Sequence, residues 1–107
     1  MKIDYVYKIC TKKEWDILKN NKFWKGTKID IEDGFIHLSN REQVNKTLNK
    51  YFSKQKNLVL ITLKTDLLKN LIWEKSKNGE IFPHLYSNLL IENVFDCKEI
   101  IGDQYLV

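Results

Sequence analysis

The longest apolar stretch of the chain runs from Leu58 to Leu63 and reads Leu-Val-Leu-Ile-Thr-Leu. A strand with one face in water alternates apolar and polar residues, whereas a continuous apolar run of this length predicts a strand buried on both faces. The stretch is far too short to cross a bilayer as a helix, so we expect no membrane association. A chain of 107 residues built around one such strand predicts a single domain over residues 1–107.

A capping-box pattern predicts a helix soon after the N-terminus. Thr11-Lys12-Lys13-Glu14 has this pattern and follows Tyr5–Cys10, a β-branched and aromatic stretch that predicts a strand. The helix is expected to turn Trp15 and Leu18 inward and to end near Asn20.

Ser39-Asn40-Arg41-Glu42 has the same pattern and predicts the start of a second helix. Apolar residues then recur at helical spacing, at Val44, Leu48, Tyr51 and Phe52. Between the two helices, Phe23–Gly26 predicts a loop or short strand, and Asp33-Gly34 predicts a turn into a strand at Phe35–Leu38.

The rest of the chain predicts mostly strands. Ile72–Lys75 and Ile81–Tyr86 flank Lys77-Asn78-Gly79, and Asn-Gly is a strong hairpin signal. One or two further strands are expected at Val94–Cys97 and Tyr105–Val107. These elements predict an α+β fold with two helices in the N-terminal half.

Both histidines of the chain lie in apolar, strand-like runs. Because side chains alternate along a strand, Phe35, His37 and Ser39 are expected to share one face. By the same rule Phe82, His84 and Tyr86 share a face of the second run. Each strand then presents a phenylalanine, a histidine and a hydroxyl group on one side, which suits a cleft wall better than a core layer.

Glu74 is the nearest candidate acid, on the face opposite Trp73, which we expect to fill the core. If these strands converge, the candidate catalytic residues are His37, Glu74 and His84. The candidate ligand-binding residues are Phe35, His37, Ser39 and Tyr86. Imidazoles donate to hydroxyl or phosphate oxygens, an aromatic ring stacks, and a carboxylate holds a ribose hydroxyl or stabilises an oxocarbenium-like centre.

Other chemistry has less support in the sequence. The chain has no glycine-rich phosphate loop, no G-x-S-x-G elbow and no HExxH motif. Cys10 and Cys97 are far apart in the sequence, and zinc needs more Cys and His than this, so we expect reduced core cysteines and no metal. The alternative, that a cysteine pairs in space with a histidine, stays open.

The formal net charge of +4 comes almost entirely from scattered lysines, and Arg41 is the only arginine. Such a surface favours solvation over a nucleic-acid interface, because lysine lacks the planar fork with which arginine grips phosphate. The first residues, MKIDYVYKICTKKEW, lack the apolar run of a signal peptide. We therefore expect a cytoplasmic protein with a small nucleotide-like or anionic ligand.

Motifs along nearly the whole chain resemble one bacterial family, domain of unknown function 952. They run in the family's order: Tyr7-Lys8-Ile9, Glu14-Trp15, Gly26, Asp30, Asp33 to Ser39, Glu42-Gln43, Leu58-Val59-Leu60, Trp73-Glu74, Phe82 to Tyr86 and Val94. The resemblance implies a small split-sheet domain related to the ADP-ribosyltransferase fold, with NAD as the implied substrate.

A second resemblance is to RNA 2′-phosphotransferases, which use NAD. Ile36-His37-Leu38-Ser39, Leu58-Val59-Leu60 and Asn78-Gly79 follow the order of that family's motifs. The resemblance implies that His37 and Ser39 line an NAD pocket. The first strand reads Val6-Tyr7-Lys8-Ile9 and carries no counterpart of that family's histidine.

Three functions follow from these observations. The first is an ADP-ribosyltransferase-like domain that binds NAD or a related nucleotide in a cleft walled by the two histidine strands. The second is a non-catalytic module that binds a small anionic metabolite or a protein tail. The third is a nucleic-acid-binding domain that uses the lysine-rich surface. The sequence sets neither the oligomeric state nor the acceptor.

Overall fold

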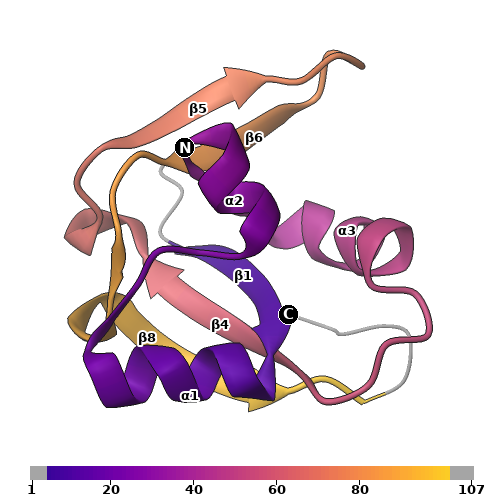
Figure 1. Cartoon of the computed structure of the whole chain (residues 1–107). Coiled ribbons are helices and arrows are strands. Elements are labelled where there is room, and N and C mark those ends of the chain that lie inside the picture. The colour runs from indigo at the N-terminus through magenta and orange to yellow at the C-terminus, as the bar shows by residue number, and fades with distance from the viewer. Residues whose placement is uncertain (1–4, 102–107) are drawn as a thin grey trace.

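Eight strands and three α-helices make up residues 5–101, the part of the chain that this computed structural model describes (Figure 1). The strands are β1 (Tyr5–Thr11), β2 (Phe23–Trp24), β3 (Ile36–His37), β4 (Leu58–Lys64), β5 (Leu71–Lys75), β6 (Ile81–Leu85), β7 (Leu89–Leu90) and β8 (Val94–Glu99). The helices are α1 (Lys12–Asn21), α2 (Lys28–Asp33) and α3 (Val44–Tyr51). Single 3-10 turns lie at Arg41–Gln43, Thr65–Leu67 and Ile91–Asn93.

The strands form three antiparallel sheets, in the orders β1-β4-β8, β2-β7 and β3-β6-β5. The fold is therefore α+β, as the sequence predicts. The Asn78-Gly79 hairpin is confirmed, because β5 and β6 pair directly across it. The predicted strand at residues 105–107 lies outside the described residues.

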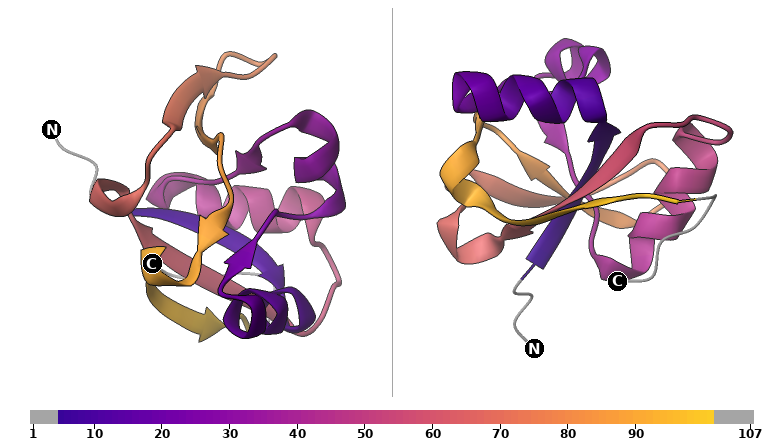
Figure 2. Two further views of the ribbon diagram at one scale, coloured as in Figure 1. Left: turned by 60° about the vertical axis from the view of Figure 1, so that its left-hand side comes forward. Right: turned by 90° about the horizontal axis from the view of Figure 1, so that it is seen from below.

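Strand β4 lies in the middle of the largest sheet and is buried on both faces, which confirms the prediction from its apolar run. Val59, Ile61 and Leu63 join one core cluster with Leu18 of α1. Leu58 and Leu60 join a second cluster, which includes the apolar face of α3. Figure 2 shows α1 and α3 on different sides of this sheet.

Strand β1 alternates between the same two clusters. Val6 and Cys10 belong to the cluster under α1, while Tyr7 and Ile9 belong to the cluster under α3. Lys8 lies between Val6 and Cys10 in this alternation and is itself buried. A charged group therefore projects from the central sheet into the interior.

The segment Ile36–Ser39 changes its partner strand halfway along. Ile36 and His37 pair with β6, and the Leu38 amide donates to the Pro83 carbonyl. Proline has no N–H to return that bond, so the ladder ends there. Ser39 instead exchanges two hydrogen bonds with Tyr7 of β1. One short segment thus joins two sheets.

Both predicted capping boxes are present, one of them shifted by a residue, and the structure contains a third that the sequence reasoning did not predict. The Thr11–Glu14 box at α1 is confirmed. The second box begins one residue later than predicted, with Asn40 as N-cap and Gln43 as its partner. A third box, Thr27 with Asp30, opens α2, a helix that the sequence reasoning did not predict.

Trp73 does not fill the core as predicted, since 36% of its surface is exposed. Its face of β5 is the inward one, because Leu71 packs against the core and pairs with buried Leu85. The β5–β6 hairpin projects beyond the rest of the molecule (Figure 1), so the core ends before it reaches Trp73.

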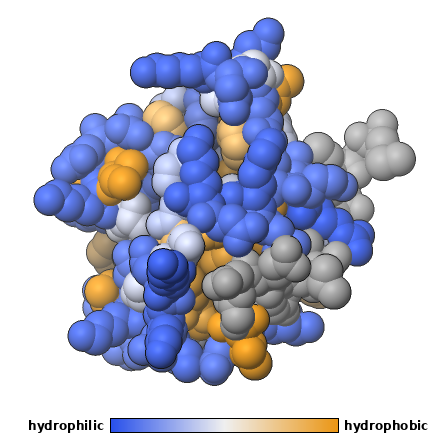
Figure 3. All heavy atoms as spheres, turned by 90° about the vertical axis from the view of Figure 1, so that its right-hand side faces the viewer, coloured by the Kyte–Doolittle hydropathy of each residue, from blue (hydrophilic) through white to orange (hydrophobic). Residues whose placement is uncertain are grey.

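The surface shown in Figure 3 is mainly hydrophilic, and its hydrophobic side chains appear in small groups. This agrees with the scattered lysines of the sequence. Among the described residues, no helix has the length and apolar character needed to span a membrane.

Replacing Thr11 by alanine is expected to lower the free energy of unfolding by about 1 kcal/mol, because the Glu14 amide loses its cap. Urea unfolding followed by tryptophan fluorescence measures this loss. Lys13→Ala, in the first turn of the same helix, is the matched control and is expected to change stability by less than about 0.5 kcal/mol. Equal effects of the two variants would contradict the capping role.

Candidate functional site

The two histidines lie directly opposite each other, on β3 and β6. The Leu38 amide donates to the Pro83 carbonyl, which makes His37–His84 a non-hydrogen-bonded pair of the ladder, the kind that brings side chains closer. The two ring centroids are 5.6 Å apart and the rings meet edge to face. The structure therefore brings both predicted histidines into one site.

Two aromatic rings surround the histidine pair. The Phe35 ring stacks on His84 at a centroid distance of 4.1 Å and lies 4.5 Å from the centroid of His37. Tyr86 lies 5.2 Å from Phe35 and is 41% exposed. These four rings form a continuous aromatic face, of which Tyr86 and the half-exposed His37 are accessible to solvent.

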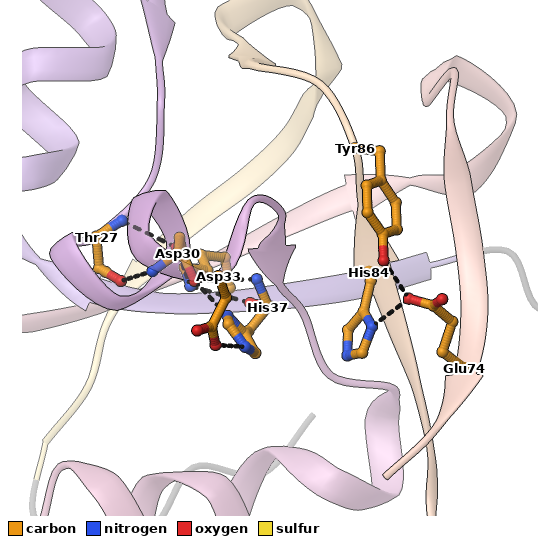
Figure 4. A network of polar contacts seen from close by, with 8 residues as sticks. Thr27, Asp30, Asp33, His37, Glu74, His84 and Tyr86 are labelled. Carbon is orange, nitrogen blue, oxygen red and sulfur yellow. Dashed lines mark hydrogen bonds and ion pairs between the residues drawn. The ribbon is translucent and has the colours of Figure 1, made fainter.

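Glu74 of β5 completes one half of the site. Its Oε1 atom lies 2.7 Å from His84 Nδ1 and accepts a 2.7 Å hydrogen bond from the Tyr86 hydroxyl (Figure 4). The hydrogen bond from Tyr86, followed by that from His84, lowers the pKa of Glu74. The same bond to Glu74 raises the pKa of Tyr86. Glu74 is therefore an anion with two fixed donors.

His37 lies between two carboxylates of α2. Its Nδ1 atom is 2.6 Å from Asp30 Oδ1, and its Nε2 atom is 3.1 Å from Asp33 Oδ2 (Figure 4). An ionised carboxylate only accepts hydrogen bonds, so the ring makes both contacts at once only when both nitrogens carry a proton. Asp30 is buried, whereas about half of the Asp33 side chain is exposed.

Asp30 is the most connected buried group of the site. Its Oδ2 atom lies 2.8 Å from Lys8 Nζ and accepts from the Thr27 amide at 2.9 Å. Burial is the strongest influence on its pKa and raises it. The hydrogen bond from His37 and the charge of Lys8 outweigh burial and hold the pKa of Asp30 well below its usual range.

Gly26 lies against Asp30 in the loop before α2. A Cβ atom at position 26 would come within 2.6 Å of the Asp30 Cβ atom, and the backbone there has a φ of +101°. Both observations require glycine, because L side chains rarely adopt this φ. The loop before α2 therefore helps to place Asp30.

Stability should fall in acid because of Asp30. Its pKa is lower in the folded protein than the ordinary value of 3.8, so below that pH the unfolded state binds more protons. The stabilisation is complete above the ordinary value and is lost as the pH falls towards the folded pKa. Urea unfolding between about pH 5 and 2 should show a steeper loss for the wild type than for Asp30→Asn. Parallel curves would contradict this assignment.

Of the predicted site residues, Ser39 is placed apart from the others. Its hydroxyl lies 3.2 Å from that of Thr47 on α3, and the side chain is buried. The prediction that it shares a face with His37 assumed a continuous strand, but the segment leaves β6 for β1 at this point. The structure does bring together Phe35, His37, Glu74, His84 and Tyr86.

Sequence reasoning missed Lys8, Asp30 and Asp33 as parts of the site. Two signals were present. Thr27-x-x-Asp30 is a capping-box spacing with aspartate in place of glutamate. Lys8 is a charged residue at an inward position of an apolar strand, and buried charges are paired.

The cysteines are not poised for nucleophilic chemistry. Burial raises the pKa of Cys10 to about 12 and that of Cys97 to about 11, so little thiolate forms at neutral pH. Within residues 5–101, no group of His, Cys, Asp and Glu has the geometry of a metal site. Two surface hollows, of about 460 and 410 Å³, are lined by other residues than the histidine face.

The chain matches a protein-family model and is similar to solved structures. A family model described as "Protein of unknown function (DUF952)" matches residues 9–97. The chain is similar to the crystal structure of protein CC0527 from Caulobacter crescentus, with 42% identity and a TM-score of 0.85 over 89% of this chain and 84% of that one. The solution NMR structure of CC0527 gives 42% identity and a TM-score of 0.80, over 89% of this chain and 83% of that one. No curated protein matches the chain.

Proposed function

The chain belongs to the DUF952 family, and from that premise we propose that the histidine face binds NAD or a related nucleotide. The observation that carries the proposal is the cross-strand His37–His84 pair, in which a carboxylate lies at each Nδ1 atom. Each imidazole is thereby oriented by its own acid, as in sites where a histidine binds or moves a proton.

The chemistry of the face suits the nicotinamide ribose end of such a ligand. Tyr86, which is 41% exposed, offers aromatic surface to a planar ring, and the exposed carboxylates of Asp33 and Glu74 favour a positively charged one. Both bonds to Glu74 end on Oε1, so within the described part of the chain Oε2 keeps acceptor capacity for a ribose hydroxyl.

The proposal includes the relationship to the ADP-ribosyltransferase fold. Two three-stranded antiparallel sheets joined by the histidine-bearing segment Ile36–Ser39 support it, as a split-sheet arrangement. In a transferase, positive charge would develop at the anomeric carbon of the ribose. Glu74 would face that charge and a histidine would act as acid or phosphate contact.

Isothermal titration with NAD, ADP-ribose and nicotinamide tests the proposal. We expect binding to the wild type, and a loss of roughly tenfold or more for Glu74→Gln, since a hydrogen bond to a charged group contributes about 1.5–3 kcal/mol. Tyr86→Phe keeps the ring but removes the bond to Glu74. Tyr51→Phe, an exposed tyrosine on α3, is the matched control and should bind as the wild type does.

No heat above buffer with any of the three ligands at millimolar concentration would overturn the proposal. If binding is observed, a second measurement, an assay for nicotinamide release from NAD, distinguishes an enzyme from a binding module. Release of nicotinamide from NAD identifies an enzyme, whereas binding without release identifies a non-catalytic module.

A further inference from the structure

Lys8 and Asp30 form a buried ion pair below the histidine face. The side chains are 6% and 1% exposed, and Lys8 Nζ lies 2.8 Å from Asp30 Oδ2. Moving two charges out of water costs free energy, and an apolar pair of similar volume often stabilises a protein equally well. The role of this pair is therefore better inferred from the groups that it contacts than from its effect on stability.

The pair contacts His37 at three separate groups. Lys8 Nζ donates to the His37 carbonyl at 2.9 Å. The His37 amide donates to Asp30 Oδ1 at 3.1 Å, and His37 Nδ1 lies 2.6 Å from the same oxygen. The backbone donor, the backbone acceptor and the ring of His37 are thus all held by one buried pair from β1 and α2.

This arrangement determines which ring nitrogen carries a proton. An ionised carboxylate has no proton to donate, so Nδ1 must be the donor in the contact with Asp30. Lys8 balances the charge of Asp30 and keeps it ionised beside the ring. Nε2 is then the only nitrogen of His37 whose role changes when the ring gains or loses a proton.

We propose that Lys8 and Asp30 are positioning residues that hold His37 with its proton on Nδ1 and present Nε2 to the ligand. Nε2 accepts a hydrogen bond when the ring is neutral and donates one when the ring is charged. The part of this inference that concerns a ligand at Nε2 rests on the proposed function. The position of the proton on His37 does not, because it can be measured without any ligand.

The other groups that face His37 determine which partner Nε2 has in each charge state of the ring. Asp33 lies at Nε2, Phe35 and His84 contact the ring, and Glu74 reaches it only through His84. The charged ring donates from Nε2 to Asp33. In the neutral ring Nε2 and Asp33 are both acceptors, so this contact weakens and Nε2 becomes available to an amide or hydroxyl donor of the ligand.

Ring nitrogen NMR of the whole protein tests the inference. Long-range ¹H–¹⁵N spectra, recorded where the imidazoles are neutral, distinguish the two proton positions. We expect His37 of the wild type to carry its proton on Nδ1. We expect Lys8→Met/Asp30→Leu, an apolar replacement of the pair, to lose this preference and to bind NAD at least tenfold more weakly in the same titration. His84, held by Glu74, should keep its spectrum and serves as the internal reference.

Lys46→Met, which removes the exposed ion pair with Glu80, is the matched control and should leave both rings unchanged. A wild-type His37 with its proton on Nε2 overturns the inference, whether or not the double variant folds. An unchanged proton position in a folded double variant overturns it too. Failure of every ligand to bind would instead count against the proposed function and leave the proton position as a separate result.

Discussion

Replacing Asp30 by alanine is expected to lower the free energy of unfolding by about 3–5 kcal/mol, the usual effect of breaking a buried ion pair. The reason is the charge that remains. Lys8 is buried, so without Asp30 its ammonium group stays out of water, and within residues 5–101 its remaining hydrogen-bond partner is the His37 carbonyl. The Thr27 amide also loses its cap. Urea unfolding at neutral pH measures the loss.

Two comparisons make this expectation specific. Asp16→Ala removes an exposed ion pair with Lys19, and surface pairs contribute only about 0–1 kcal/mol. The apolar double variant Lys8→Met/Asp30→Leu should recover much of the stability, because neither charge is then left alone. Asp30→Ala and Asp16→Ala with equal losses would show that the buried pair has no special energetic role.

The second large effect is expected for Gly26→Ala. A backbone φ of +101° is strained for alanine, at about 1–3 kcal/mol. The new Cβ atom would also lie 2.6 Å from the Asp30 Cβ atom, so Asp30 must move. Because Asp30 binds the ring and amide of His37, the His37 resonances should shift together with the loss of stability.

Gly79 supplies a matched control for this variant. It has a similar φ of +89°, but a Cβ atom there would meet nothing within 4 Å. Gly79→Ala should therefore carry the backbone strain alone and leave the His37 resonances in place. If both alanine variants lose the same stability, the contact between Gly26 and Asp30 has no energetic consequence.

Much of the fold could be predicted from local patterns. The apolar run at Leu58–Leu63, the Thr11–Glu14 cap and the Asn78-Gly79 hairpin each depend on a few neighbouring residues, and each is confirmed. Helix α2 was missed because Lys28–Asp33 is only six residues long and leaves Ile29 and Ile31 exposed. A helix this short shows no amphipathic period to recognise.

The candidate site could be predicted only in part. Strand alternation predicted that His84 and Tyr86 share a face, and in the structure both contact Glu74 of the neighbouring strand. It misplaced Ser39, because the chain leaves β6 after Leu38 and pairs with β1 at Ser39. The position of β1 relative to this segment cannot be predicted from strand alternation. Asp30 of α2 reaches His37 across a turn, and Lys8 reaches Asp30 from β1, which is in a different sheet from His37. No local spacing encodes the contact between Lys8 and Asp30.

The partner change within Ile36–Ser39 has a consequence for the dynamics of the molecule. The Leu38 amide is bonded to the β6 side and the next amide, of Ser39, to β1. Hydrogen exchange at these two neighbouring amides therefore reports two different opening events, one for each sheet. A ligand that bridges His37 and His84 should slow exchange at Leu38 more than at Ser39. The exchange rates of two adjacent amides would thus show separately which of the two sheets a bound ligand stabilises.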